Sequence, residues 1–279
     1  MSSAPSLSET FLQAFHEARP GLTSKAYGGL PLVFRGQEMD SSYALLTEVV
    51  PASSQAIEVL DLACGEGHLL GLLAARRQPG LALSGLDMSA AELALARTRL
   101  GAQADLKQGR AQALPYPDGV FDCVLCHMAL MLMDELDEVM RELRRVLRPG
   151  GRFAAVVGAM PPDSPVLSAY LEALSRRSRL PQFAGLRLGD RRLRSPEGIR
   201  EVFASGFDEL VIEELHLPLR LAPAQLRDWF LDLYDLQLLS AADRELVEHE
   251  LMQAVTGATG PDGMLDFPQA LRFLSARAV

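Results

Sequence analysis

The chain reads Val59-Leu60-Asp61-Leu62-Ala63-Cys64-Gly65-Glu66-Gly67 where a short apolar run gives way to a glycine-rich turn. The run at 57–62 is typical of a strand buried on both faces, and residues 67–77 have the apolar spacing of a helix. Glycines between a strand and a helix let the backbone adopt positive φ and approach a ligand closely. The pattern therefore predicts a βα unit with a ligand-binding turn.

The same alternation of strand and helix continues along the chain. Strands are predicted at 57–62, 81–86, 106–108, 121–126, 152–157, 207–219 and 264–276, with helices at 67–77, 90–100 and 134–147. Arg148-Pro149-Gly150-Gly151 is expected to be a sharp stop and turn. Short connections between alternating elements are typical of a doubly wound sheet, in which ligands bind beyond the carboxyl ends of the strands. We therefore predict an α/β fold with a Rossmann-like sheet.

Three interpretations of the glycine-rich turn differ in the ligand they assign. A tight βα turn occurs in many α/β proteins and needs no ligand. A dinucleotide site requires a third glycine three residues after the second, but Leu70 stands there and Gly71 comes one residue late. Asp61 also precedes the glycines, where its carboxylate would repel a pyrophosphate. A cationic ligand with an amino group fits Asp61 better.

Asp87 ends the second predicted strand, 22 residues after Gly65. An acid at this place can accept hydrogen bonds from the ribose hydroxyls of an adenosine. Taken alone, an Asp before a helix is also typical of a helix cap. Together with the turn, Asp87 favours a site for an adenosyl group.

Five motifs in order extend this pattern over residues 57–157. They are Asp61-x-Ala63-Cys64-Gly65-x-Gly67, the strand-end Asp87, Gly109-x-Ala111-x-x-Leu114-Pro115-Tyr116, Phe121-Asp122-x-Val124 and Leu147-Arg148-Pro149-Gly150-Gly151. In this order they resemble the class I methyltransferases, and most of all the type 11 group, which is similar to enzymes of ubiquinone and menaquinone biosynthesis. The resemblance implies a seven-stranded sheet with helical lid insertions, S-adenosyl-L-methionine as the cofactor, and methyl transfer as the reaction.

The resemblance also implies which residues contact the cofactor. The glycine-rich turn would hold its methionine part and ribose, Asp87 the ribose, and Met88 the adenine. The segment at Arg110 would line the adenine edge, and the end of the fourth strand would face the sulfonium and the acceptor. The implied cofactor-binding residues are Asp61, Ala63, Cys64, Gly65, Gly67, Asp87, Met88, Arg110, Ala111, Gln112, Cys126 and His127.

Two residues depart from the pattern of the family. Ala63 replaces the first glycine of the turn, which is a mild change if its φ is negative. Arg110 replaces an acid, and a guanidinium cannot accept a hydrogen bond from the amino group of adenine. We expect the backbone of Ala111 and the carbonyl of Gln112 to take over that contact.

His127 and His16 are candidate catalytic residues, because a histidine can act as a general base near neutral pH. His127 follows a strand beside the expected cofactor, and His16 lies on a helix predicted at 6–19. A structural role is the alternative for either one. Cys123 and Cys126 form a C-x-x-C pattern, but residues three apart on a strand point to opposite faces. We expect two buried thiols there and no metal site.

The predicted domain organisation has two parts. Residues 1–50 form an N-terminal helical lid, with a loop at 20–36 and a second helix capped by Ser41-Ser42. Residues 51–279 form the methyltransferase domain, with insertions at about 160–194 and 223–254 that cap the active site. The side chains expected to line a hydrophobic substrate pocket are Tyr27, Tyr43, Met128, Met131, Trp229 and Tyr234, with core packing as the alternative.

Composition restricts the partners. A net charge of −9 disfavours nucleic acid, and no apolar run is long enough to span a bilayer. With three cysteines and no signal-peptide pattern, we expect a cytoplasmic monomer or homodimer. Arginines at 176, 177, 179, 187, 191, 192, 194 and 200 form either a solvated surface or a grip on an anionic substrate or carrier protein.

These observations predict an S-adenosylmethionine-dependent methyltransferase of a small, apolar or partly anionic metabolite, for example in natural-product biosynthesis. The acceptor atom is left open among oxygen, nitrogen and carbon. One alternative is a protein that binds the cofactor but catalyses a non-methylating step. The other is a methyltransferase of protein or RNA. Cys126-His127-Met128-Ala129 stands where enzymes that methylate amide or base nitrogens carry Asn-Pro-Pro-Tyr, which disfavours that group.

Overall fold

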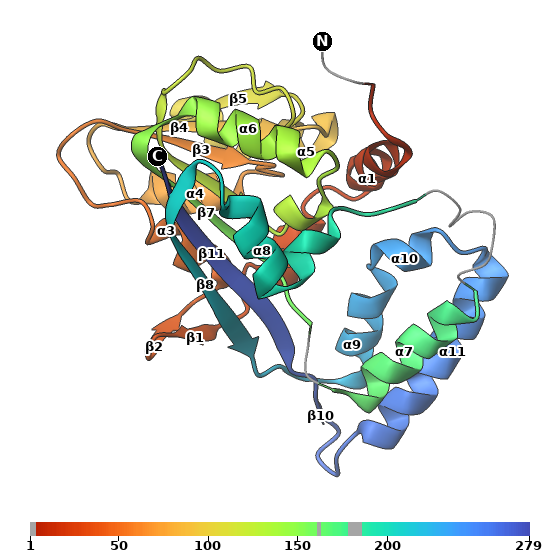
Figure 1. The fold of residues 1–279 in the computed structure, drawn as a ribbon. Coiled ribbons are helices and arrows are strands. Elements are labelled where there is room, and N and C mark those ends of the chain that lie inside the picture. The colour runs from red at the N-terminus through yellow and green to blue at the C-terminus, as the bar shows by residue number, and fades with distance from the viewer. Residues whose placement is uncertain (1–3, 161–162, 178–185) are drawn as a thin grey trace. The chain divides into compact units, whose positions relative to one another are not determined.

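A seven-stranded sheet forms the centre of the structure, a computed structural model that describes residues 4–160, 163–177 and 186–279 (Figure 1). Its strand order is β5-β4-β3-β6-β7-β11-β8. The strands are β3 (Ile57–Leu62), β4 (Leu81–Asp87), β5 (Asp105–Gln108), β6 (Phe121–His127), β7 (Leu147–Gly158), β8 (Phe207–Leu217) and β11 (Gln269–Ala278). The predicted α/β fold class is confirmed.

Parallel pairing brings the carboxyl ends of the central strands to one edge of the sheet. β3 pairs in parallel with both β4 and β6, β4 pairs with β5, and β6 pairs with β7. β11 runs antiparallel to β7. Because Asp61 and Asp87 stand at the ends of the neighbouring strands β3 and β4, they meet at the edge where ligands bind in this kind of sheet.

Helices cover both faces of the sheet. They are α1 (Leu7–Ala18), α2 (Leu22–Tyr27), α3 (Ser42–Thr47), α4 (His68–Ala75), α5 (Ala90–Leu100), α6 (Leu136–Val146) and α8 (Pro196–Phe203). Short 3-10 turns lie at Gly101–Gln103, Leu130–Leu132 and Arg191–Arg194. Ser41 accepts a hydrogen bond from the third residue of α3 and caps that helix as predicted, and Ser89 caps α5 in the same way.

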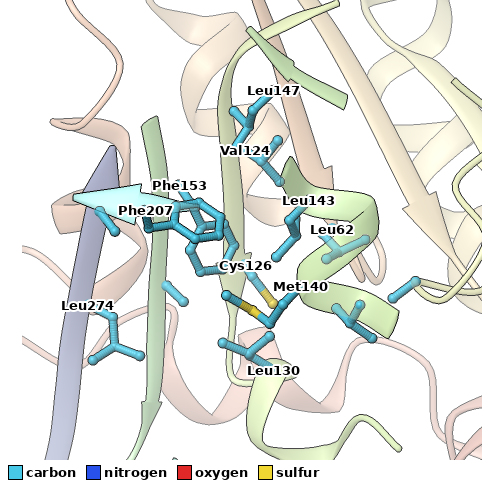
Figure 2. Packing of buried hydrophobic residues seen from close by; sticks show 14 of the residues in the cluster. Leu62, Val124, Cys126, Leu130, Met140, Leu143, Leu147, Phe153, Phe207 and Leu274 are labelled. Atoms are coloured by element: carbon cyan, nitrogen blue, oxygen red, sulfur yellow. The ribbon is translucent and has the colours of Figure 1, made fainter. Parts of the chain in front are cut away.

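The main core lies between the sheet and α6 and α8 (Figure 2). Cys126 of β6 is fully buried there beside Met140 and Leu143 of α6. Its neighbour His127 points to the opposite face, as successive residues of a strand do, and there it contacts α3. Because side chains alternate along β6, Cys126 packs in the core and His127 lies on the side of the candidate site.

Three local predictions were wrong. The expected loop at 20–36 contains α2 and the start of a hairpin of β1 (Leu32–Phe34) and β2 (Gln37–Met39). The expected turn at 148–151 is a bulge inside β7. Phe121 of β6 pairs with Leu147 and Cys123 pairs with Arg152, so β7 advances five residues while β6 advances two. The expected strand at 264–276 is divided into β10 (Leu265–Asp266) and β11.

The chain divides into two compact units. The first comprises 1–160, 188–215 and 271–279, and the second comprises 161–187 and 216–270. The second unit contains α7 (Pro165–Ser175), α9 (Pro223–Leu231), α10 (Tyr234–Gln237), α11 (Ala241–Ala258) and the strand pair of β9 (Arg220–Leu221) and β10. Its helices enclose a core of their own around Tyr170, Phe230 and Phe267. None of the helices described is long and apolar enough to cross a membrane.

Candidate functional site

The glycine-rich turn after β3 has an unusual backbone. Ala63, Gly65 and Gly67 all have positive φ, at 61°, 51° and 79°. The left-handed region costs a residue with a Cβ about 1–2 kcal/mol. Ala63 is therefore strained, and the condition under which we expected its substitution to be mild is not met.

Gly67 is required for close packing as well as for its φ. A Cβ on Gly67 would stand 2.9 Å from Leu100 Cδ1 and 3.2 Å from Ala96 Cβ. The first turn of α4 can therefore pack directly on α5. This contact fixes the glycine-rich turn at the carboxyl edge of the sheet.

Asp87 closes the turn from the neighbouring strand. Its two carboxylate oxygens accept hydrogen bonds from the backbone N–H groups of Gly65 and Ser89, each at 2.8 Å. Burial raises the pKa of Asp87, and these two hydrogen bonds act in the opposite direction. Because each carboxylate oxygen has a second acceptor site, Asp87 keeps the capacity to bind hydroxyl groups.

Four buried acids gather around the turn: Asp61, Glu66, Asp87 and Glu92, called here the acidic cluster. Glu66 forms an ion pair with Arg99 at 2.5 Å, and Glu92 Oε1 lies 3.1 Å from His16 Nδ1. Asp61 differs, because its carboxylate has no hydrogen bond or ion pair with any residue of the described chain. Burial raises its pKa well above the usual range, and the charges of Asp87 and Glu66 raise it further.

The N-terminal segment, defined as residues 4–47, contacts this cluster. Gly21 donates its N–H to Glu92 Oε2 at 3.0 Å, and the Ser24 hydroxyl binds Glu66. Gln13 donates to the carbonyl of Met88 at 3.2 Å. His16 thereby links α1 to α5 through Glu92, and its role as a catalytic base stays a prediction.

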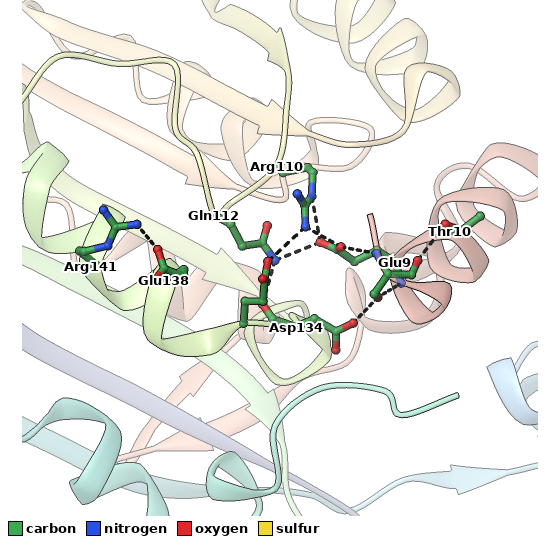
Figure 3. Close-up of polar contacts among 9 residues, drawn as sticks. Glu9, Thr10, Arg110, Gln112, Asp134, Glu138 and Arg141 are labelled. Atoms are coloured by element: carbon green, nitrogen blue, oxygen red, sulfur yellow. Dashed lines mark hydrogen bonds and ion pairs between the residues drawn. The ribbon is translucent and has the colours of Figure 1, made fainter. Parts of the chain in front are cut away.

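A second polar group joins α1 to the segment after β5 (Figure 3). Glu9 of α1 binds Arg110 through two hydrogen bonds, Nε to Oε1 at 3.1 Å and Nη2 to Oε2 at 2.6 Å. Gln112 donates its amide to Glu9 Oε1 at 3.0 Å and to the carbonyl of Asp134 at 2.8 Å. The predicted adenine-edge residues Arg110 and Gln112 are thus held by an acid from the N-terminal segment.

His127 is buried beneath the same segment. Its Nε2 lies 2.8 Å from the hydroxyl of Ser42, and the ring of Tyr43 stacks on it with a centroid distance of 3.5 Å. Tyr27 meets it edge-on at 6.0 Å. Burial, followed by the charge of His68, lowers the pKa of His127 to about 3. The imidazole is therefore neutral at physiological pH and is a weak base, contrary to the expected general base.

Several other predicted residues serve the fold. The side chains of Cys126 and Ala111 are buried in the main core, so they offer a cofactor no contact through their side chains. Cys64 is also buried, with its Sγ packed against Gly85. Met131 packs against the main core, while Met128 follows β6 with a φ of 53°. No cluster of three or more metal-binding side chains occurs in the described parts of the chain.

Trp229 and Tyr234, predicted to line the substrate pocket, belong to the second unit. Trp229 packs on Phe267 with ring centroids 5.2 Å apart, and Tyr234 begins α10. Their contact with a substrate stays a prediction, as does the capping role of the two insertions. Four arginines of the arginine-rich segment have carboxylate partners: Arg176, Arg177, Arg192 and Arg200. These four are engaged within the chain, and Arg179 lies outside the described residues.

Sequence reasoning missed three residues that contact the site from other elements. Glu9, Ser42 and Glu92 lie outside every ligand motif of the sequence. The spacing Ser6-x-x-Glu9 does match a helix capping box, which the structure contains. That local pattern gives no sign of the contact with Arg110, 101 positions further along the chain.

Comparison with known proteins assigns the part of the chain that carries these motifs. Residues 60–155 match the family model described as a methyltransferase domain. The ubiquinone/menaquinone biosynthesis C-methyltransferase UbiE of Hahella chejuensis is 35% identical over 117 residues, 40% of this chain and 47% of that protein. UbiE of Methylobacterium nodulans is 32% identical over 152 residues, 53% of this chain and 60% of that protein. The chain thus spans about half of the length of these relatives.

Among solved structures, the [4+2]-cyclase SpnF has a similar fold, with a TM-score of 0.56 and 22% sequence identity. The alignment covers 100% of this chain and 98% of that one. This likeness concerns the fold alone. The matched segment contains the glycine-rich turn, Asp87, Gln112 and His127. Residues 60–155 thus match the methyltransferase domain family, and this part of the chain is similar to enzymes of ubiquinone and menaquinone biosynthesis.

Proposed function

We propose that the chain binds S-adenosylmethionine at the acidic cluster and transfers its methyl group to a small molecule. The observation that carries this proposal is the carboxylate of Asp61, buried to 2% exposure without a partner in the described chain. A buried carboxylate beside other acids is unfavourable unless a cation joins it. The ammonium and sulfonium groups of S-adenosylmethionine provide that positive charge.

The remaining groups fit the other parts of the cofactor. Asp87 has acceptor capacity for the ribose hydroxyls, and its own orientation is fixed by Gly65 and Ser89. When bound, S-adenosylmethionine supplies a methyl group that its sulfonium activates. The protein then has to orient the acceptor and exclude water. The N-terminal segment, which covers the acidic cluster and His127, supports the second task.

Neutral His127 restricts the mechanism that we propose. An imidazole with a pKa of about 3 cannot remove a proton efficiently near pH 7. We infer that His127 orients groups in the site by packing and hydrogen bonding. This suits an acceptor that is already nucleophilic, or whose proton leaves to water. The relatives named for ubiquinone and menaquinone biosynthesis support a small-molecule acceptor, but the matched segment contains no part of the second unit.

The first test is cofactor binding, measured by isothermal titration calorimetry with S-adenosylmethionine and S-adenosylhomocysteine. Asp87→Ala removes acceptors for two ribose hydroxyls, and bonds to a charged acceptor are worth about 1.5–3 kcal/mol each. We expect the dissociation constant to rise about 100-fold or more. Asp105→Ala, at an exposed position of β5, is the matched control and should bind normally. Absence of binding by the unaltered protein would overturn the proposal.

The second test separates methyl transfer from binding alone. The protein is incubated with S-adenosylmethionine carrying a tritiated methyl group and a panel of hydroquinones, phenols and amines. We expect label in the organic product together with one S-adenosylhomocysteine per methyl group. Consumption of an acceptor into an isomer of unchanged mass, with no label transferred, would show a non-methylating catalyst.

A further inference from the structure

Arg110 leaves a gap in recognition of the cofactor's base, because a guanidinium has no acceptor for the amino group of adenine. The gap lies beside the ribose-binding residue. Gly109 donates its N–H to the carbonyl of Asp87 at 3.0 Å, and Gln108 pairs with Asp87 across the strands β4 and β5. A base attached to a ribose at Asp87 therefore reaches the segment that contains Arg110 and Gln112.

Glu9 cannot fill the gap itself, although it brings a carboxylate to this edge. Its Oε1 accepts from Arg110 Nε and Gln112 Nε2, and its Oε2 accepts from Arg110 Nη2 and the backbone N–H of Ser6. Both oxygens thus already have two donors, which is the usual capacity of a carboxylate oxygen. Glu9 is 5% exposed and serves as a fixed anchor.

Gln112 has the acceptor that the site needs. Both hydrogens of its amide nitrogen are engaged, one by Glu9 Oε1 and the other by the Asp134 carbonyl. These two acceptors fix which end of the carboxamide is nitrogen. Within the described chain Gln112 Oε1 has no donor, and this oxygen is not sealed from solvent. Figure 3 shows the oxygen directed away from Glu9.

We propose that Glu9 is a positioning residue for cofactor recognition, and that the Gln112 oxygen it orients accepts a hydrogen bond from the adenine 6-amino group. The inference rests on the proposed function. It gives α1 a part in selecting the base, because the helix carries the anchor of the amide. It also explains how Arg110 is tolerated, since Glu9 restores the negative charge lost at that position.

The test compares two ligands by calorimetry: S-adenosylhomocysteine and its 6-deamino analogue, in which hydrogen replaces the amino group. The unaltered protein should bind the adenosyl ligand about tenfold more tightly, the equivalent of one hydrogen bond of about 1.4 kcal/mol. Gln112→Leu should reduce this ratio to about one and leave the affinity for the deamino ligand within about threefold. Glu9→Leu should do the same, and Glu9→Gln, which keeps one acceptor oxygen, should retain part of the ratio.

Ser6→Ala is the matched control. It removes the capping box of α1 but leaves both carboxylate oxygens of Glu9 in place. If α1 acts only by docking, Ser6→Ala and Glu9→Leu will lower the affinity for both ligands equally, and the inference is overturned. It is also overturned if Gln112→Leu keeps the tenfold ratio. Circular dichroism confirms that each variant is folded. Failure of the unaltered protein to bind either ligand refutes the proposed function instead, which is a distinguishable result.

Discussion

Ala63 is the residue where sequence and backbone disagree most clearly. Its φ of 61° costs about 1–2 kcal/mol for alanine. Glycine would remove that strain but would gain about 0.4–1 kcal/mol of backbone entropy in the unfolded state. We expect Ala63→Gly to raise the free energy of unfolding by about 1 kcal/mol, measured by urea denaturation.

Ala102→Gly is the control for that measurement, because Ala102 is exposed and lies outside the positive-φ positions. There glycine brings only the entropic cost, so the free energy of unfolding should fall. Equal losses in the two variants would contradict the strain assigned to Ala63.

His127 makes the protein sensitive to acid. Its pKa is about 3 when folded and about 6.5 when unfolded, so the unfolded chain binds more protons between these values. Its contribution to stability is complete above pH 6.5 and decreases as the pH falls towards 3. From pH 6.5 to pH 5 the loss is about 2 kcal/mol, at about 1.4 kcal/mol for each pH unit.

Urea denaturation at several pH values checks this contribution. His127→Gln, which can still hydrogen-bond Ser42, should lose about 2 kcal/mol less than the unaltered protein between pH 6.5 and 5. His249→Gln, at an exposed position of α11, should follow the unaltered protein. If both variants show the unaltered pH dependence, the imidazole is not buried in its neutral form.

At the scale of elements, hydrophobic periodicity in the sequence predicts the central strands correctly. The strands β3, β4 and β6 are mostly apolar runs, and the sequence places the bounds of each to within one residue. The hairpin of β1 and β2 was missed because its turn, Arg35-Gly36, lacks the Asn-Gly or Asp-Gly signal of a tight hairpin. The bulge in β7 was missed because Pro149-Gly150 reads locally as a turn.

Contacts between distant elements account for the rest of the site. The turn and Asp87 were predicted because strand ends of a parallel sheet meet at one edge. The links of α1 to the segment after β5, and of α3 to β6, depend on single side chains such as Glu9 and Ser42. A contact between two side chains that are far apart in the sequence produces no periodic pattern. Such contacts are therefore visible only in the structure.

At the scale of the whole molecule, the family match lies within the first of the two units. The match at 60–155 includes Asp61, Asp87 and Gln112 of the proposed cofactor site. The second unit, with its own core around Phe230 and Phe267, lies entirely outside the match. Turnover with candidate acceptors therefore tests the part of the chain that the match does not include.

In the proposed complex, a cation of the cofactor joins the carboxylate of Asp61, which has no partner in the described chain. Because burial and neighbouring acids raise the pKa of Asp61, the free protein keeps a proton there below that pKa. A bound cation favours the ionised form, so binding releases this proton and tightens as the pH rises through the raised pKa. Asp61→Asn cannot release it.

The most direct measurement is calorimetric titration with S-adenosylmethionine over a range of pH, in pairs of buffers that differ in ionisation enthalpy. We predict that the unaltered protein releases protons on binding. Asp61→Asn should bind about 10-fold to 100-fold more weakly, with that release lost. Binding of equal strength by both proteins, with identical proton exchange, would contradict the account.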